Sequence, residues 1–223
     1  MPFTIKVISP IKIDEADLRR RKMRYGAQAR ADTQIEVFNL QEGPTSLSTP
    51  GDILFCEHAV FQEGMRSSPE EFDAILIDCV FDPAVPALRE ECPLPVFGPM
   101  QVTLPLVHLI ANKFSYVARA ERQTQWLAAL ARQYGYEAQL ASARFLGISY
   151  QESRNPKIFD AAMQQQLGKA VTEDGAEAIV MGSTTMALGE EVAAAAGGVP
   201  VFLPGMVALG VMETLWENGF LKR

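Results

Sequence analysis

"DAILIDCVFDPAVPALRE" (residues 73–90) and "EAIVMGSTTMALGEEV" (residues 177–192) are the two stretches of this sequence that decide the fold. Each begins with a short apolar run typical of a buried strand and then enters a segment of helical character. When the two apolar runs are aligned, Cys79 and Ser183 occupy the same position, 104 residues apart. Polar chemistry usually lies at such strand ends, so these two residues are the first candidates for function.

A second pair of segments repeats at nearly the same spacing. Residues 95–104 are "PVFGPMQVTL" and residues 200–209 are "PVFLPGMVAL". A repeat of this length predicts two similar α/β halves within one chain. If the halves face each other, Cys79 and Ser183 lie on opposite sides of one cleft, as two-sided chemistry on a small molecule requires. The alternative is a duplicated fold without a shared site.

Apolar segments of strand length alternate with longer helical segments along the chain. The expected strands are residues 3–9, 34–40, 74–79, 94–98, 114–118, 137–148, 178–183 and 199–205. The expected helices are residues 16–31, 53–65, 84–91, 104–113, 122–135, 156–175 and 190–198. Apolar strands separated by helices are typical of parallel sheets covered on both faces. We therefore predict an α/β fold with short parallel sheets flanked by helices.

The composition narrows the class of protein. The 223 residues are 48% hydrophobic and 21% charged, and the net charge of −7 argues against a nucleic-acid partner. No apolar run is long enough to cross a bilayer, so no membrane partner is expected. Three scattered cysteines suit reduced thiols in a cytoplasmic protein, and Cys/His metal spacing is absent. The basic cluster "RRRKMR" (residues 19–24) is interpreted as a solvated helix face rather than a phosphate site.

Two motifs at the strand ends resemble the signatures of a known superfamily. "CVFDPAVPALRE" (residues 79–90) is similar to a Cys-Phe-x-Asp-Pro-Gly signature. "GAEAIVMGSTTMA" (residues 175–187) is similar to a Gly-Ala-Glu-Ala-Ile-Val-x-Gly-Cys-x-Gly-Met signature. Both signatures are those of the aspartate/glutamate/hydantoin racemase superfamily, in its hydantoin racemase-like branch. The resemblance covers nearly the whole chain.

The resemblance carries expectations about architecture and activity. It implies two pseudo-symmetric α/β subdomains, residues 1–98 with 206–223 and residues 99–205, with the active site in the cleft between them. It implies a racemase or isomerase of a small carbonyl or carboxylate compound that needs no metal, pyridoxal phosphate or nucleotide. Neither a P-loop nor a dinucleotide-binding glycine motif is present in the sequence. The resemblance also implies that copies of this chain can associate into a homo-oligomer.

The sequence departs from the family pattern at four places. Ser183 stands where the second cysteine is expected, and Thr185 replaces a glycine. Residues 9–12 are Ser-Pro-Ile-Lys where the family often has Asn-Pro-Asn-Thr. Gln101 stands where an acidic residue is common. The missing second thiol leaves the type of reaction open.

Cys79 is the candidate acid/base. Racemisation beside a carbonyl removes a proton from one face and returns one to the other, and a thiol with a pKa near ~8.5 can serve either direction. Asp82 is expected to cap the following helix and Pro83 to open it, so that the helix dipole would favour a thiolate. The alternative is a small core residue at the strand end. Cys56 and Cys92 are interpreted as core and structural residues.

Ser183 is the candidate on the opposite side. A hydroxyl is a poor proton shuttle without a neighbouring base, so hydrogen bonding to a substrate oxygen is its expected role. Ordinary helix capping by the Ser-Thr-Thr segment is the alternative. The expected substrate contacts are Ser9, Val80, Phe81, Thr184 and Thr185.

Three classes of function compete. The first is a cofactor-independent racemase or isomerase that uses Cys79 as acid/base. The second is a one-thiol enzyme in the same cleft, which could be a decarboxylase, a cis–trans isomerase or a hydrolase. The third is a small-molecule binder without catalysis. The sequence does not name the substrate.

Overall fold

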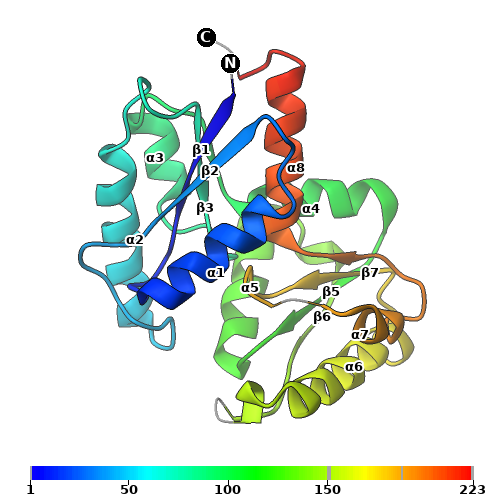
Figure 1. Cartoon of the computed structure of the whole chain (residues 1–223). Helices are drawn as coiled ribbons and strands as arrows, with labels where there is room; N and C mark the ends of the chain where they lie inside the picture. The colour runs from blue at the N-terminus through cyan, green and yellow to red at the C-terminus, as the bar shows by residue number, and fades with distance from the viewer. Residues whose placement is uncertain (1, 150–151, 187, 222–223) are drawn as a thin grey trace. The chain divides into compact units, whose positions relative to one another are not determined.

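The computed structural model describes residues 2–149, 152–186 and 188–221. The chain divides into two compact units (Figure 1). Unit 1 comprises Met1–Val102 and Gly205–Arg223, and unit 2 comprises Thr103–Pro204. The chain therefore leaves unit 1 once, completes unit 2, and returns for its last helix.

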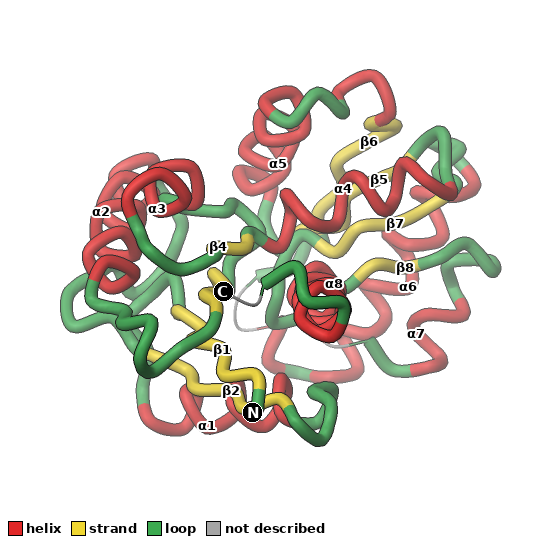
Figure 2. Tube along the Cα trace, turned by 90° about the horizontal axis from the view of Figure 1, so that it is seen from above, coloured by secondary structure: helices red, strands yellow, loops and turns green. Residues whose placement is uncertain are grey.

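Unit 1 is a parallel four-stranded sheet between two layers of helices. Its strands are β1 (Phe3–Ile8), β2 (Thr33–Phe38), β3 (Ala74–Ile77) and β4 (Val96–Phe97), in the order β2-β1-β3-β4. Its helices are α1 (Glu15–Gly26), α2 (Pro50–Met65), α3 (Val85–Glu91) and α8 (Pro204–Glu217). Figure 2 shows α2 and α3 together on one side of the strands, with α1 and α8 on the other.

The two faces of this sheet form separate apolar cores. Side chains from β1, β3 and β4 pack with α2 and α3 on one face. On the other face, β1, β2 and β3 pack with Tyr25 of α1 and with Ala208, Leu209 and Met212 of α8. All four residues of β3 are buried, because a central parallel strand is covered on both sides.

Unit 2 repeats the plan. Its strands are β5 (Phe114–Ala118), β6 (Leu140–Phe145), β7 (Ala178–Met181) and β8 (Val201–Phe202), in the order β6-β5-β7-β8. Its helices are α5 (Glu121–Gln133), α6 (Pro156–Thr172) and α7 (Glu190–Ala194), and α4 (Pro99–Ile110) passes into it from unit 1. Two short 3₁₀ turns, Glu137–Gln139 and Glu152–Arg154, complete it.

The repeat seen in the sequence is a repeat of topology. Ile75 of β3 pairs with Val96 of β4, and Ile179 of β7 pairs with Val201 of β8. Both sheets are wholly parallel and have the same strand order when the strands are matched one to one. The predicted fold class, two pseudo-symmetric α/β subdomains with short parallel sheets flanked by helices, is confirmed.

One helix was not predicted. Residues 204–217 form α8, although the sequence analysis gives no helix after residue 198. Its apolar residues continue directly from the strand β8, so the change of periodicity is hard to see. The helix is fixed on unit 1 by packing, including a stacked contact of Trp216 on Phe3 with ring centroids 4.7 Å apart. Over the described residues, the helices are all too short or too polar to cross a membrane.

Candidate active site

Cys79 lies in a tight turn at the carboxyl end of β3. The amide of Asp78 still donates to the carbonyl of Ile8, 2.9 Å away, so the ladder to β1 continues one residue past the strand. The Cys79 amide then turns back to the carbonyl of Ile77 at 2.8 Å. Cys79 belongs to the core cluster under α2 and α3 and is only 4% exposed.

This burial determines the protonation state of the thiol. Desolvation raises the pKa of Cys79 well above its ordinary value, and the nearby Cys56 thiol adds to the rise. A hydrogen bond from the Phe81 backbone acts in the opposite direction but does not offset it. The raised pKa favours the neutral thiol, whereas the helix dipole was expected to favour a thiolate. Cys56 and Cys92 are buried as well, in agreement with their interpretation as a core and a structural residue.

The turn after Cys79 differs from the predicted helix start. The cap of α3 is Ala84, in the left-handed conformation with φ 59°, and its side chain makes no capping bond. Asp82 also has a positive φ, 49°. Its carboxylate instead accepts hydrogen bonds from the amides of Met100 at 3.0 Å and Gln101 at 2.6 Å. Asp82 thus caps the start of α4, and its assignment as the cap of α3 was wrong, as was Pro83 as the first helical residue.

The close approach of Asp82 to α4 depends on a glycine. A Cβ added at Gly98 would lie 2.5 Å from Cγ of Asp82. Gly98 lies between β4 and α4, and the Asp82 carboxylate occupies the space that a side chain at this position would fill. The Asp82 carboxylate therefore links the turn after Cys79 to the junction between β4 and α4.

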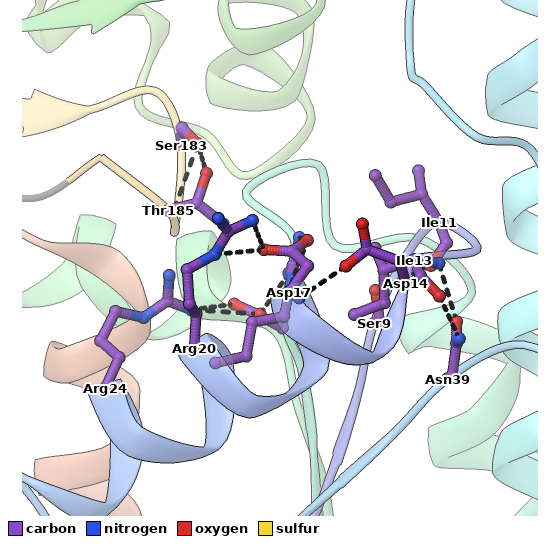
Figure 3. Close-up of polar contacts among 12 residues, drawn as sticks. Ser9, Ile11, Ile13, Asp14, Asp17, Arg20, Arg24, Asn39, Ser183 and Thr185 are labelled. Carbon is purple, nitrogen blue, oxygen red and sulfur yellow. Dashed lines mark hydrogen bonds and ion pairs between the residues drawn. The ribbon is translucent and has the colours of Figure 1, made fainter. Parts of the chain in front are cut away.

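The other predicted contacts of unit 1 lie beside this turn. Val80 is buried, and Phe81 is half-buried against the core cluster that contains Cys79. Ser9 follows β1, the strand next to β3, and is fully buried. Its Oγ donates to the carbonyl of Ile11 at 2.8 Å, so the hydroxyl stabilises the loop that follows β1 (Figure 3).

Ser183 lies two residues beyond β7 in unit 2, as Cys79 lies two residues beyond β3 in unit 1. Gly182 precedes it, and its amide donates to the carbonyl of Val117 at 2.8 Å. The Ser183 and Thr185 hydroxyl oxygens are 3.1 Å apart, and the Thr185 amide donates to Ser183 Oγ at 3.2 Å (Figure 3). Ser183, Thr184 and Thr185 are all half-buried. They form a turn of hydroxyl groups that can donate to or accept from an oxygen of a ligand.

The helix-capping alternative for this turn is wrong. Helix α7 begins only at Glu190, and its cap is Gly189, which makes no side-chain capping bond. The hydroxyls of Ser183, Thr184 and Thr185 therefore do not cap the start of α7.

The basic cluster of α1 contains the polar residues that the sequence analysis missed. Arg21 is 5% exposed, and its Nη1 lies 2.5 Å from Oδ2 of Asp78. Tyr25 donates its hydroxyl to Oδ1 of Asp78 at 2.7 Å, and Nη2 of Arg24 lies 3.2 Å from both oxygens. Among its basic residues, Arg19, Arg20 and Lys22 are exposed as predicted for the cluster, whereas Arg21 is buried and Arg24 is half-buried.

A sequence signal for this network exists. Arg21 and Tyr25 are four residues apart, and Leu18 precedes them by one turn, so all three share a helix face. An arginine on the same face as a tyrosine and a leucine needs a buried acceptor. Asp78, the acidic residue at the end of an otherwise apolar strand, is the acceptor.

The comparisons with known proteins extend over most of the chain. A family model described as Asp/Glu/Hydantoin racemase matches residues 20–211. The chain belongs to this family. A hydantoin racemase of Pseudomonas sp. (strain NS671) is 32% identical over 193 residues, which cover 86% of this chain and 77% of that protein. A hydantoin racemase of Paenarthrobacter aurescens is 30% identical, with 84% of this chain and 80% of that protein covered.

The fold agrees with that of a solved relative. Allantoin racemase from Klebsiella pneumoniae superposes with a TM-score of 0.86 at 24% identity, covering 97% of this chain and 89% of that one. The prediction of an enzyme of the Asp/Glu/hydantoin racemase type is confirmed by these relatives. Within the described residues, no group of three or more His, Cys, Asp or Glu side chains could hold a metal ion.

Proposed function

We propose that this protein is a cofactor-independent racemase of a hydantoin-like compound, with Cys79 as acid/base and Ser183 at the opposing position. The observation that carries the proposal is the equivalent placement of the two residues. Each lies two positions beyond the strand that is third in the order of its sheet, β3 in one unit and β7 in the other. The family relatives named hydantoin racemase supply the substrate class.

The structure of the hydantoin ring explains how racemisation at C5 would proceed. The hydantoin C5–H bond lies beside a carbonyl, so loss of the proton leaves charge that the carbonyl oxygen can carry. Sγ of Cys79 would give a proton to C5 from one face, and in the opposite direction it would take that proton back. The hydroxyls of Ser183, Thr184 and Thr185 would hold the developing oxyanion. On the other face, a solvent water hydrogen-bonded to Ser183 would take the C5 proton, since a hydroxyl alone is a weak base, and the thiolate left after Cys79 donates would regain its proton from solvent.

A one-thiol decarboxylase is the second candidate. Two observations favour it, the raised pKa of Cys79 and the hydroxyl at position 183. A neutral thiol is ready to donate a proton, and loss of carbon dioxide supplies the electron pair that a base would otherwise release. Such a reaction needs only one proton-transfer group.

Deuterium exchange distinguishes the two candidates. A single enantiomer of a 5-monosubstituted hydantoin is incubated with the protein in deuterated water and followed by NMR and polarimetry. A racemase incorporates one deuterium at C5 as rotation falls to zero. Absence of exchange, together with gas release from a malonate-type substrate, contradicts the racemase and supports the decarboxylase.

Ser183→Cys sharpens the result, with Ser142→Cys as a control serine outside the turn. A second thiol at position 183 should accelerate exchange at C5 if the two positions share one substrate. An equal response of both variants would contradict the pairing of Cys79 with Ser183.

A further inference from the structure

The polar network of α1 leaves one of its guanidinium groups incompletely hydrogen-bonded. Asp78 has no exposed side-chain surface and already receives close hydrogen bonds from Arg21 and Tyr25. Arg20 and Arg21 also pair with Asp17. The network thus joins three guanidinium groups, on Arg20, Arg21 and Arg24, to the carboxylates of Asp17 and Asp78, and the Asp14 carboxylate adds a favourable charge interaction with Arg20.

Arg24 carries the incompletely hydrogen-bonded guanidinium. Its two contacts with Asp78 are 3.2 Å long, compared with 2.5 Å for Arg21. Nε of Arg24 is buried and has no hydrogen-bond partner among the described residues. A buried unsatisfied donor costs free energy, and more when it is charged. The side chain as a whole is 24% exposed, so a ligand can reach it.

The position of Arg24 connects it to the candidate active site. Asp78, which its guanidinium contacts, is the residue immediately before Cys79. The guanidinium therefore lies at the carboxyl edge of the unit 1 sheet, where ligands of parallel α/β sheets bind. The Arg24 guanidinium also lies over the ring of Tyr25, with Cζ of Arg24 5.0 Å from the ring centroid.

We propose that Arg24 binds the carboxylate of an anionic substrate beside the turn that carries Cys79. The inference rests on the proposed function and names its substrate class: a hydantoin-like ring with an acidic substituent. A planar guanidinium matches a carboxylate in charge and geometry. A doubly charged phosphate fits less well, because Asp17 and Asp78 already neutralise the neighbouring arginines.

Two probes that differ only in charge test the proposal. Hydantoin-5-acetic acid and its neutral amide, hydantoin-5-acetamide, are titrated into the protein by isothermal calorimetry. The parent should bind the acid more tightly by at least about tenfold, the effect of one charge-assisted hydrogen bond. Arg24→Gln should lose this preference while its affinity for the amide stays the same.

Two further variants serve as controls. Arg20→Gln removes an exposed arginine one turn earlier on α1, which Figure 3 shows paired with Asp17, and should keep the full preference. Arg24→Lys keeps the charge beside Asp78 and so protects folding, but it loses the planar fork and should retain only part of the preference. Equal affinity of the parent for both probes, or an unchanged preference in Arg24→Gln and Arg24→Lys, overturns the proposal.

The outcomes separate this inference from the proposed function. Deuterium exchange at C5 is measured for both probes in the same samples. Exchange without a carboxylate preference would leave the racemase proposal intact and overturn the role of Arg24. A carboxylate preference that depends on Arg24, without exchange, would support the binding site and contradict racemisation.

Discussion

The ends of β3 and β7 occupy the same place in two sheets of the same order, and yet they carry different chemistry. After β3 come a buried carboxylate, a thiol and a second buried carboxylate, Asp78, Cys79 and Asp82. After β7 come a glycine and three hydroxyl residues. The sheet requires only apolar residues within the strands, so the residues just beyond them are free to diverge.

The neighbouring helix accounts for one of these differences. Helix α1 follows β1 and places Arg21 and Tyr25 against Asp78. Helix α5 follows β5 in the same way, but it places Leu127 near Gly182. A Cβ at Gly182 would lie 2.8 Å from Cα of Ala118 and 2.9 Å from Cδ1 of Leu127. A polar helix face therefore accepts a charged residue at the strand end, and an apolar face in close contact leaves room only for glycine.

The largest effect is expected at Cys79. Cys79→Ala should lower the turnover of the proposed racemase by about 10³-fold, because a general acid/base typically contributes 10²–10⁴. Ser183→Ala should lower it less, by about tenfold, if the hydroxyl only holds an oxyanion with its neighbours. Both are measured as deuterium exchange at C5. Cys92→Ala is the control, and equal losses at positions 79 and 183 would mean that the two turns act alike.

The second effect is on stability, at Asp82. Asp82→Ala should lower the free energy of unfolding by about 3 kcal/mol, because two amides of α4 lose a charged acceptor and alanine is unfavourable at positive φ. Urea unfolding followed by circular dichroism measures the loss. Asp82→Asn retains one acceptor oxygen and should lose about half as much. A loss of the same size in both variants would show that charge, rather than hydrogen bonding, fixes this turn.

A substitution at Gly182 tests the close packing at the end of β7. Gly182→Ala should lower the free energy of unfolding by about 2 kcal/mol, because the new Cβ would be forced against the backbone of Ala118. Gly168→Ala is the matched control in α6. Its Cβ would meet nothing closer than the carbonyl of Ala195 at 3.7 Å, so the variant should be as stable as the parent or slightly more stable. Chemical denaturation of both variants gives the answer, and equal stability of the two would refute the steric explanation.

The smallest effect per residue is a pH dependence that arises in unit 1, because all three cysteines lie in it. Burial raises the pKa of Cys56 to about 12 and that of Cys79 well above its ordinary value. The folded state therefore keeps these protons while the unfolded state begins to lose them near pH ~8.5. Stability should be constant below that pH and fall above it, by about 1 kcal/mol per thiol at pH ~9.5.

The pH effect is measured by urea unfolding between neutral and alkaline pH. A double variant, Cys56→Ala with Cys79→Ala, removes both titrating groups and should have a flatter profile than the parent. A profile with the same slope in the double variant would assign the alkaline loss to other groups.

The sequence predicted the sheet architecture because buried parallel strands leave a local signal. The apolar run at residues 74–77 and its repeat at residues 178–181 identify β3 and β7 without any knowledge of their neighbours. The family signatures at residues 79–90 and 175–187 led to the racemase family, which the comparisons confirm. The assignment of Cys79 and Ser183 as a catalytic pair stays a prediction.

Two of the errors share one cause, which is that the partner of a polar group lies far away in the chain. Asp82 looked like a cap for the helix that follows it, but its amide partners are 18 and 19 residues further on. The basic run at residues 19–24 looked solvated, because Asp78 is 57 residues from Arg21. Local propensity describes which residues prefer a cap or a surface, and it cannot say which helix end or carboxylate will be within reach.

By itself, the sequence determined that this chain forms two repeated parallel α/β sheets and that a thiol and a hydroxyl follow their matching strands. Hydrophobic periodicity and repetition are properties of the chain alone, so both could be read from it. Only the tertiary structure decided that the thiol is neutral, that Asp82 holds the start of α4, and that Arg24 keeps positive charge beside Asp78. Solvation and hydrogen bonding depend on which distant groups folding brings together, and that information exists only in three dimensions.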